Sequence, residues 1–481
     1  MHTFKKIAAC IVLMGLMASS CTKKFEETNV DPNLIDQISP GTLLNPIIYN
    51  VSSFNMQRAD DITFNLMQVA LPYPSPSGGV HRYDMSENQG NSTWNNHYQW
   101  LNNVKEMYTA SVKAKNGNYQ GIAMVLNAWM YSNLTDCFGD IPMEEASHAE
   151  EDATFRPKFN TQKEVYTKIL ADLDSANKLF NTATPMPYAS DILYANNVTK
   201  WKKFCNSLRL RLLLRVSKKA EMNAWAQIRT MVDNPTQYPV FASNAEAAIL
   251  SISGVAPLMS PWARAIDFTT FRAVGKFFLD SLNALNDPRR PKFASQAKSI
   301  PGGTAIGYQG IPSGYTGSES QFNYTPSNVT AALVTAPMIN IIMSYAEVQF
   351  IKAELEWRYG NAAAAKTAYE AGTKAAIEQW GLTMATDYFT SNPNAAYNGT
   401  LPRIMLQKYY ALYFNDYQQW FEYRRTGLPV MPVADGMLNN KIMPVRFKYP
   451  INVRTLNPEN YNKAAAACGN DDINFKSWWA Q

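Results

Sequence analysis

Residues 348–381 read VQFIKAELEWRYGNAAAAKTAYEAGTKAAIEQWG and decide the fold class. The first half has apolar residues at helical spacing and ends at Tyr359-Gly360, where glycine can stop a helix. The second half is rich in alanine, with Ala364, Ala368 and Ala375 on one side. Small residues allow two helices to approach closely. The stretch therefore predicts two packed antiparallel helices joined by a short turn.

This helix-turn-helix unit resembles a tetratricopeptide repeat, whose period is about 34 residues. No clean second copy occurs along the chain, so we expect any further copies to be degenerate.

Helical periodicity also dominates outside this unit. Thr161 can cap one such helix, and 121–134 is so apolar that we expect it to be buried on every side. The segment 329–346 is too polar for a membrane span and is interpreted as a buried helix after a loop. The expected helices cover 43–69, 94–113, 121–134, 161–180, 201–219, 221–232, 271–285, 339–359, 362–380 and 403–425. The prediction is an all-α fold of tetratricopeptide-like helix pairs.

Three long irregular stretches interrupt the helices: 70–93, 298–330 and 426–461. They are rich in proline and glycine, and the first two also carry aromatic residues. Loops of this length in a compact protein are usually functional or disordered, and their aromatic residues argue against disorder.

Composition excludes several classes of protein. The 481 residues are 46% hydrophobic and 17% charged, so the chain should fold. The formal net charge of +5 falls to +3 without residues 1–20, which carry two lysines and no acid, so we expect no nucleic-acid partner. Four histidines and five cysteines argue against a histidine-rich metal enzyme and a disulfide-stapled scaffold.

The first 20 residues have the pattern of a secretory signal. Lys5 and Lys6 precede a short apolar run, and Ala18-Ser19-Ser20 precedes Cys21. Small residues directly before a cysteine resemble a bacterial lipoprotein signal, in which Cys21 would carry the lipid. We therefore predict a signal peptide at 1–20, a lipidated tether at 21–40 and a single α-helical domain at 41–481, with its loop-rich binding region at about 256–335.

Motifs for catalysis are missing from the sequence. No serine-hydrolase elbow, zinc-protease helix or phosphate loop occurs, and acid pairs such as Asp60-Asp61 are interpreted as solvated or capping residues. We expect no catalytic residue, no metal and no cofactor. The remaining cysteines are Cys137, Cys205 and Cys468. We expect them to be small buried residues, or to include one disulfide.

The basic helix 201–215 has leucines on all sides, which an interfacial membrane helix lacks. We therefore expect its arginines, Arg209, Arg211 and Arg215, to pair with carboxylates of neighbouring helices.

The loop aromatics are the positive signal for function, because sugar rings stack on aromatic faces while nearby polar groups bond the hydroxyls. Trp262 stands in a proline-bounded stretch just before a helix, where exposure is expected. The alternative is that these rings are buried under their own loops. The candidate ligand-binding residues are Tyr73, His81, Tyr83, Trp262, Tyr308, Tyr315 and Tyr324, with Arg82, Asp84 and Gln309 as polar neighbours.

Several separate stretches together resemble the SusD/RagB family of nutrient-binding outer-membrane lipoproteins. The matching stretches, in the family's order, are Asp136–Ala146, Trp201–Arg215, Leu282–Arg289, Met343–Glu354, Gln419–Gly427, Arg446–Pro450 and Asn457–Tyr461. They span nearly the whole mature chain.

The resemblance implies a non-catalytic protein that captures a glycan, or in some members a peptide, at the outer membrane. It also implies a SusC-like TonB-dependent transporter as partner. The matched motifs belong to the scaffold, so they assign no ligand residue. Two other functions remain open: a lipoprotein glycoside hydrolase, and a helical-repeat adaptor without a small ligand.

Overall fold

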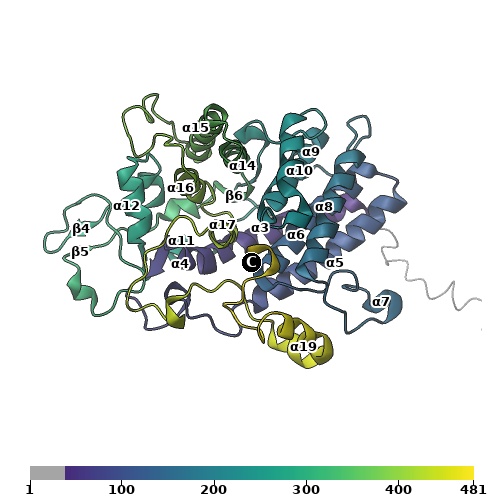
Figure 1. Cartoon of the computed structure of the whole chain (residues 1–481), viewed down its shortest axis with the longest axis horizontal. Coiled ribbons are helices and arrows are strands. Elements are labelled where there is room, and N and C mark those ends of the chain that lie inside the picture. Colours follow the sequence, from purple (N-terminus) through teal and green to yellow (C-terminus); the bar gives the residue numbers. More distant parts are fainter. Residues whose placement is uncertain (1–37) are drawn as a thin grey trace, which may run out of the picture. The chain divides into compact units, whose positions relative to one another are not determined.

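The computed structural model describes residues 38–481, and residues 39–481 form one compact unit (Figure 1). The predicted signal peptide, Cys21 and most of the tether lie outside the described residues. No helix in the described part is long and apolar enough to cross a membrane.

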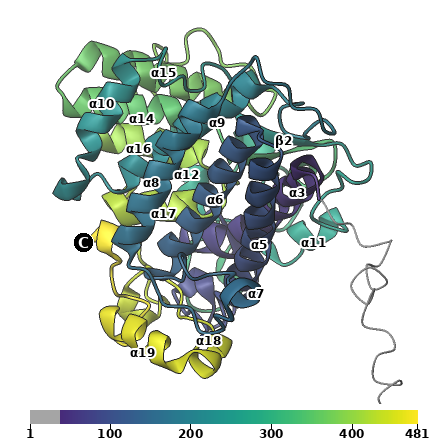
Figure 2. The ribbon, with the colours of Figure 1, turned by 90° about the vertical axis from the view of Figure 1, so that its right-hand side faces the viewer.

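The first half of the unit is a row of long helices, each packed on the next, as Figure 2 shows for α5, α6, α8 and α9. The helices of this half are α3 (Pro40–Arg58), α4 (Phe64–Leu66), α5 (Asn91–Lys113), α6 (Gly117–Phe138), α7 (Ala149–Asp152), α8 (Gln162–Leu179), α9 (Val198–Arg215) and α10 (Ala224–Asp233). A π-helical turn, Ala59–Thr63, joins α3 to α4.

The second half adds short helices and a second set of packed helices. These are α11 (Ala265–Thr269), α12 (Lys276–Ala284), α13 (Arg290–Phe293), α14 (Tyr345–Arg358), α15 (Ala362–Glu378), α16 (Leu401–Ala411), α17 (Gln418–Thr426), α18 (Ile451–Leu456) and α19 (Pro458–Ala467). Helix α14 packs against α9, α15 and α16, which ties the two halves together. The predicted fold class, helical with tetratricopeptide-like pairs, is confirmed.

The pair α14–α15 forms as its sequence predicts. The helices are joined by Tyr359–Asn361, where Gly360 adopts a φ of 75° and the Asn361 side chain accepts a hydrogen bond from the backbone N–H of Ala364 at 3.3 Å. Small residues matter at the contact: a Cβ on Gly372 would lie 3.1 Å from the Phe350 ring. A larger side chain there would push the two helices apart.

Helix α8 begins at the predicted cap. The Thr161 hydroxyl accepts from the backbone N–H of Glu164 at 3.3 Å, and the Glu164 carboxylate accepts from the N–H of Thr161 at 2.7 Å. This reciprocal pairing satisfies two donors that the first turn of a helix leaves free.

Four expected helical segments are wrong in part: 339–359, 329–346, 271–285 and 403–425. Residues Met338–Met343 form strand β6, paired antiparallel with β2 (Ala248–Ile252), where 339–359 and 329–346 were expected to be helical. A short apolar run rich in isoleucine fits a buried strand as well as a buried helix, and only its partner β2 decides between them. Likewise, the expected helix 271–285 begins with strand β3 at Arg272–Val274. The expected helix 403–425 is divided, because residues 412–417 separate α16 from α17.

The other two sheets are also two-stranded. Strand β1 (Ala70–Pro72) pairs antiparallel with β3, and β4 (Lys298–Ser299) pairs with β5 (Tyr324–Thr325). These short ladders lie in the predicted loop stretches and give them backbone order.

The predicted ion pairs of the basic helix are confirmed. Arg209 bonds Asp174 at 2.6 Å, Arg211 bonds Glu347 at 2.6 Å, and Arg215 lies 3.5 Å from Asp136. The carboxylates come from α8, α14 and α6, so α9 is bonded to three neighbours. The cysteines Cys137, Cys205 and Cys468 are free and buried, as the first of the two alternatives expected.

A second buried ion cluster joins α14, α16 and α17. Arg425 donates two hydrogen bonds to Glu354, at 2.7 and 2.6 Å, and one to Glu422 at 2.8 Å. Lys408 donates to the same Glu422 carboxylate at 2.6 Å. Burial raises the pKa of Glu422, but Arg425 and Lys408 outweigh it and hold that pKa well below its ordinary value.

We predict that Arg425→Met lowers the free energy of unfolding by about 3–5 kcal/mol, because it leaves the Glu354 carboxylate buried without its bidentate partner. Urea denaturation followed by circular dichroism measures the change. Lys463→Met is the matched control, since Lys463 makes an exposed pair with Glu459 at 2.8 Å. The control should unfold like the wild type. Equal losses in both variants would contradict the assigned role of the cluster.

Candidate functional site

The candidate site is built on the β1–β3 pair, which brings three distant segments together. Leu71 lies opposite Ala273, and the backbone N–H of Tyr73 donates to the Phe271 carbonyl at 2.8 Å. The third segment joins where the N–H of Val274 donates to the Ser327 carbonyl at 2.8 Å. The loops 70–83, 255–275 and 298–329 are therefore bonded through their backbones.

Close approach of these backbones requires glycine at one point. A Cβ on Gly310 would lie 2.5 Å from the Val274 carbonyl oxygen. No side chain fits at that distance, so Gly310 allows the third loop to lie against β3.

Aromatic rings gather where the loops meet. Phe322 lies at the centre, with ring centroids 6.5 Å from Tyr73, 5.1 Å from Tyr315 and 5.8 Å from Tyr324. Tyr73, Phe322 and Tyr324 are half-buried, whereas Tyr315 is buried beneath them. We call Tyr73, Phe322 and Tyr324 the aromatic platform.

Phe271 is bonded through its backbone to Tyr73 of the platform and is unusual in two respects. Its ring is 77% exposed, and its φ of 54° lies in the left-handed region that bulky residues avoid. Such strain persists only where surrounding contacts impose it, and it is common at functional sites. Here, the bond from Tyr73 and the start of β3 hold the Phe271 backbone.

Polar groups support the platform from below. The Tyr315 hydroxyl accepts from the N–H of Ser75 at 3.1 Å and donates to Glu319 at 2.8 Å. Arg82 donates to the Ser75 hydroxyl at 3.1 Å and to the Tyr315 carbonyl at 2.8 Å. These bonds join the loop 70–83 to the loop 298–329 and fix the position of the Tyr315 ring against Phe322.

His81 is part of the same support. Its Nε2 lies 2.9 Å from the Ser75 hydroxyl, and burial, with Arg82 next, lowers its pKa to about 4. The imidazole is therefore neutral at neutral pH. Burial, followed by the hydrogen bond to Glu319, raises the pKa of Tyr315 to about 12. Neither His81 nor Tyr315 therefore changes its charge near pH 7.

The seven predicted residues separate into three groups. Tyr73 and Tyr324 lie in the platform. His81, Tyr83 and Tyr315 are buried, at 2%, 2% and 6% exposure, so they offer no open ring face for stacking. The loops fold over these three rings, and Tyr83 belongs to the main apolar core.

The remaining two predicted residues lie outside the platform. Trp262 is half-buried and packs edge-on against Phe268 and Phe414, at centroid distances of 5.5 and 6.1 Å. The Arg290 guanidinium lies over the Tyr308 ring, 5.6 Å from its centroid. Sequence reasoning did not select Phe322 or Phe271. Phe322 alternates with polar residues in the stretch Gln321–Thr325, a period-two signal that could have marked it.

The described residues hold no cluster of three or more histidine, cysteine or acidic side chains suited to a metal ion.

Solved structures share this fold over nearly the whole chain. A chitin-binding protein has a TM-score of 0.79 at 22% identity, covering 92% of this chain and 100% of its own. A SusD homologue from Bacteroides fragilis gives 0.76 at 24%, with the same coverage. A chitin-binding SusD homologue from Flavobacterium johnsoniae gives 0.74 at 20%, covering 91% and 97%. No curated protein matches the chain.

A family model agrees with these structures. The SusD-like model, which represents starch-binding proteins associating with the outer membrane, matches residues 32–450. The match confirms the resemblance found in the sequence and the prediction of a binding protein rather than an enzyme. The chain therefore belongs to the SusD-like family of starch-binding proteins associated with the outer membrane.

Proposed function

We propose that the aromatic platform, with Phe271 beside it, binds a neutral oligosaccharide at the cell surface. The observation that carries the proposal is the set of accessible rings on loops held by backbone bonds: Tyr73, Phe322 and Tyr324 in contact, and Phe271, whose backbone carbonyl accepts from Tyr73. Accessible aromatic faces match the flat C–H faces of sugar rings.

Polar residues flank the rings and suit sugar hydroxyls. Gln321 and Asn323 are exposed on either side of Phe322 in the sequence. Rings with a few hydrogen-bonding groups are what a neutral sugar chain requires. A purely apolar ligand would leave these groups without partners.

The anchor and the partner complete the proposal. Cys21 carries lipid and attaches the protein to the outer membrane through the tether, and the bound glycan passes to a SusC-like TonB-dependent transporter. The sequence of residues 18–21 and the family membership support these two steps.

A glycan array identifies the ligand, and calorimetry then tests the site. We predict that Phe271→Ala and Phe322→Ala each weaken binding about fivefold, since a stacked ring contributes on the order of 1 kcal/mol. Phe155→Ala is the matched control, because Phe155 is 76% exposed on a loop between α7 and α8. The control should bind like the wild type.

The same experiment distinguishes the three hypotheses: glycan binding at the platform, glycoside hydrolysis, and an adaptor without a small ligand. Unchanged affinity in both Phe271→Ala and Phe322→Ala, with the fold intact, would place the ligand elsewhere. Release of reducing ends at turnover rates would indicate a glycoside hydrolase. Binding to a protein partner with no glycan or peptide affinity would indicate an adaptor.

We also predict that affinity for the neutral ligand is constant between about pH 5.5 and pH 8, because His81 with a pKa of about 4 stays neutral and Tyr315 with a pKa of about 12 stays protonated. Calorimetry across this range is the measurement. A tenfold change in affinity within it would show that a titrating group contacts the ligand.

Finally, we predict that Cys21→Ala releases the protein from membranes, since the variant has no acceptor for lipid. Fractionation in a host that lacks the transporter measures this and removes retention through the partner. Cys468→Ala, which changes a buried free cysteine, is the control and should stay membrane-bound. Complete membrane retention of Cys21→Ala would refute the anchor.

A further inference from the structure

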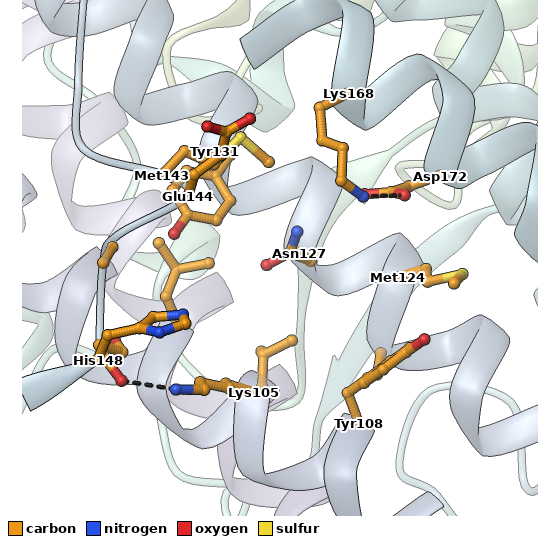
Figure 3. Close-up of a pocket in the computed structure, with 15 residues that line it drawn as sticks. Lys105, Tyr108, Met124, Asn127, Tyr131, Met143, Glu144, His148, Lys168 and Asp172 are labelled. Atoms are coloured by element: carbon orange, nitrogen blue, oxygen red, sulfur yellow. Dashed lines mark hydrogen bonds and ion pairs between the residues drawn. The ribbon is translucent and has the colours of Figure 1, made fainter. Parts of the chain in front are cut away.

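A cavity of about 420 Å³ lies away from the loop site, between α5, α6, α8 and the segment 143–148 (Figure 3). Its volume falls within the range of small-molecule pockets, about 300–1,000 Å³. Its elements lie at the end of Figure 1 opposite β4 and β5, so it is separate from the aromatic platform.

The walls of the cavity are mostly apolar. Leu101 and Val104 come from α5, Ala123 and Met124 from α6, and Met143 from the covering segment. The two methionines have flexible side chains that adapt to irregular ligands. Such walls favour an apolar molecule.

Two neutral polar groups on α6 line this apolar space. Tyr131 is 6% exposed, and its hydroxyl bonds no other residue in the part of the chain that the structure describes. Burial alone raises the pKa of Tyr131 well above its ordinary value, so the hydroxyl stays protonated. Asn127, one helical turn earlier, also faces the cavity (Figure 3). Both groups are available to a ligand.

Most charged groups at the rim are already paired; Glu144 is exposed and makes no ion pair among the described residues. Lys105 lies 2.8 Å from Glu151, and Lys168 lies 2.5 Å from Asp172. Lys105 also donates to the Ser147 carbonyl at 2.7 Å, which holds the covering segment over the cavity. Pairing leaves neither lysine as a free anion-binding group, so an anionic ligand gains little here.

From these observations we infer that the cavity binds a neutral, mostly apolar small molecule with one hydroxyl or carbonyl group, which bonds Tyr131 and Asn127. A sugar fits less well, because the hydroxyls that face Leu101, Val104, Met124 and Met143 would have no partners there. The site therefore differs in ligand chemistry from the loop site and does not depend on the function proposed for it.

The test uses p-cresol as probe, with toluene as the matched molecule lacking the hydroxyl. Saturation-transfer NMR titration should show saturable p-cresol binding and weaker toluene binding. Tyr131→Phe should weaken p-cresol binding about fivefold, the effect of one neutral hydrogen bond, and should leave the urea midpoint unchanged because no protein partner loses a bond. Met124→Trp, which fills the cavity, should abolish binding.

Tyr410→Phe is the matched control, because the buried Tyr410 hydroxyl donates to the Phe278 carbonyl at 2.8 Å and Tyr410 does not line the cavity. This variant should lower the urea midpoint and bind p-cresol normally. The inference is overturned if p-cresol shows no saturable binding, if toluene binds equally well, or if Tyr131→Phe and Met124→Trp both bind p-cresol like the wild type.

Discussion

The bidentate bond between Arg425 and Glu354 fixes the scaffold on which the rest of the molecule depends. It joins α17 to α14 in the interior, and Lys408 of α16 joins the same cluster through Glu422. A buried charge without a partner is far more costly than an unfilled apolar contact, so the register of these helices is the one that pairs Arg425 with Glu354 and Lys408 with Glu422. Arg211 and Glu347 extend the same constraint to α9.

The scaffold controls the candidate site through the chain that follows α17. That segment runs back to the loops, where Arg82 donates to the Gly436 carbonyl at 3.1 Å and the backbone N–H of Leu438 donates to the Arg82 carbonyl at 2.8 Å. Arg82 also supports Tyr315, the ring beneath Phe322. The position of the aromatic platform therefore depends on polar bonds to a segment whose own position is set by the ion cluster.

The helices were predictable because their signals are local. Thr161 and Glu164 form a cap from four residues, and the alanines of α15 sit one turn apart. Strand β6 was not predictable, because its identity depends on β2, some 90 residues earlier. Which of the loop aromatic rings are exposed was not predictable either. Tyr83 and Tyr315 are buried while Phe271 is exposed, and only the three-dimensional course of the loops distinguishes them.

The loop that carries Phe322 is closed at its base, so its proposed ligand-binding residues can change without altering the stability of the helical core. The backbone N–H of Ser295 donates to the Asn328 carbonyl at 2.8 Å, and Ala294 bridges Val329. A loop closed in this way loses little stability when its length changes, since closure entropy grows only with the logarithm of length. The platform rings are held by contacts within the loops, whereas the cluster of Arg425, Glu354, Glu422 and Lys408 lies among the helices. Substitutions in the stretch Gln321–Thr325 can therefore alter the binding face while the helical core keeps its contacts, whereas Gly310 must stay glycine to lie against β3.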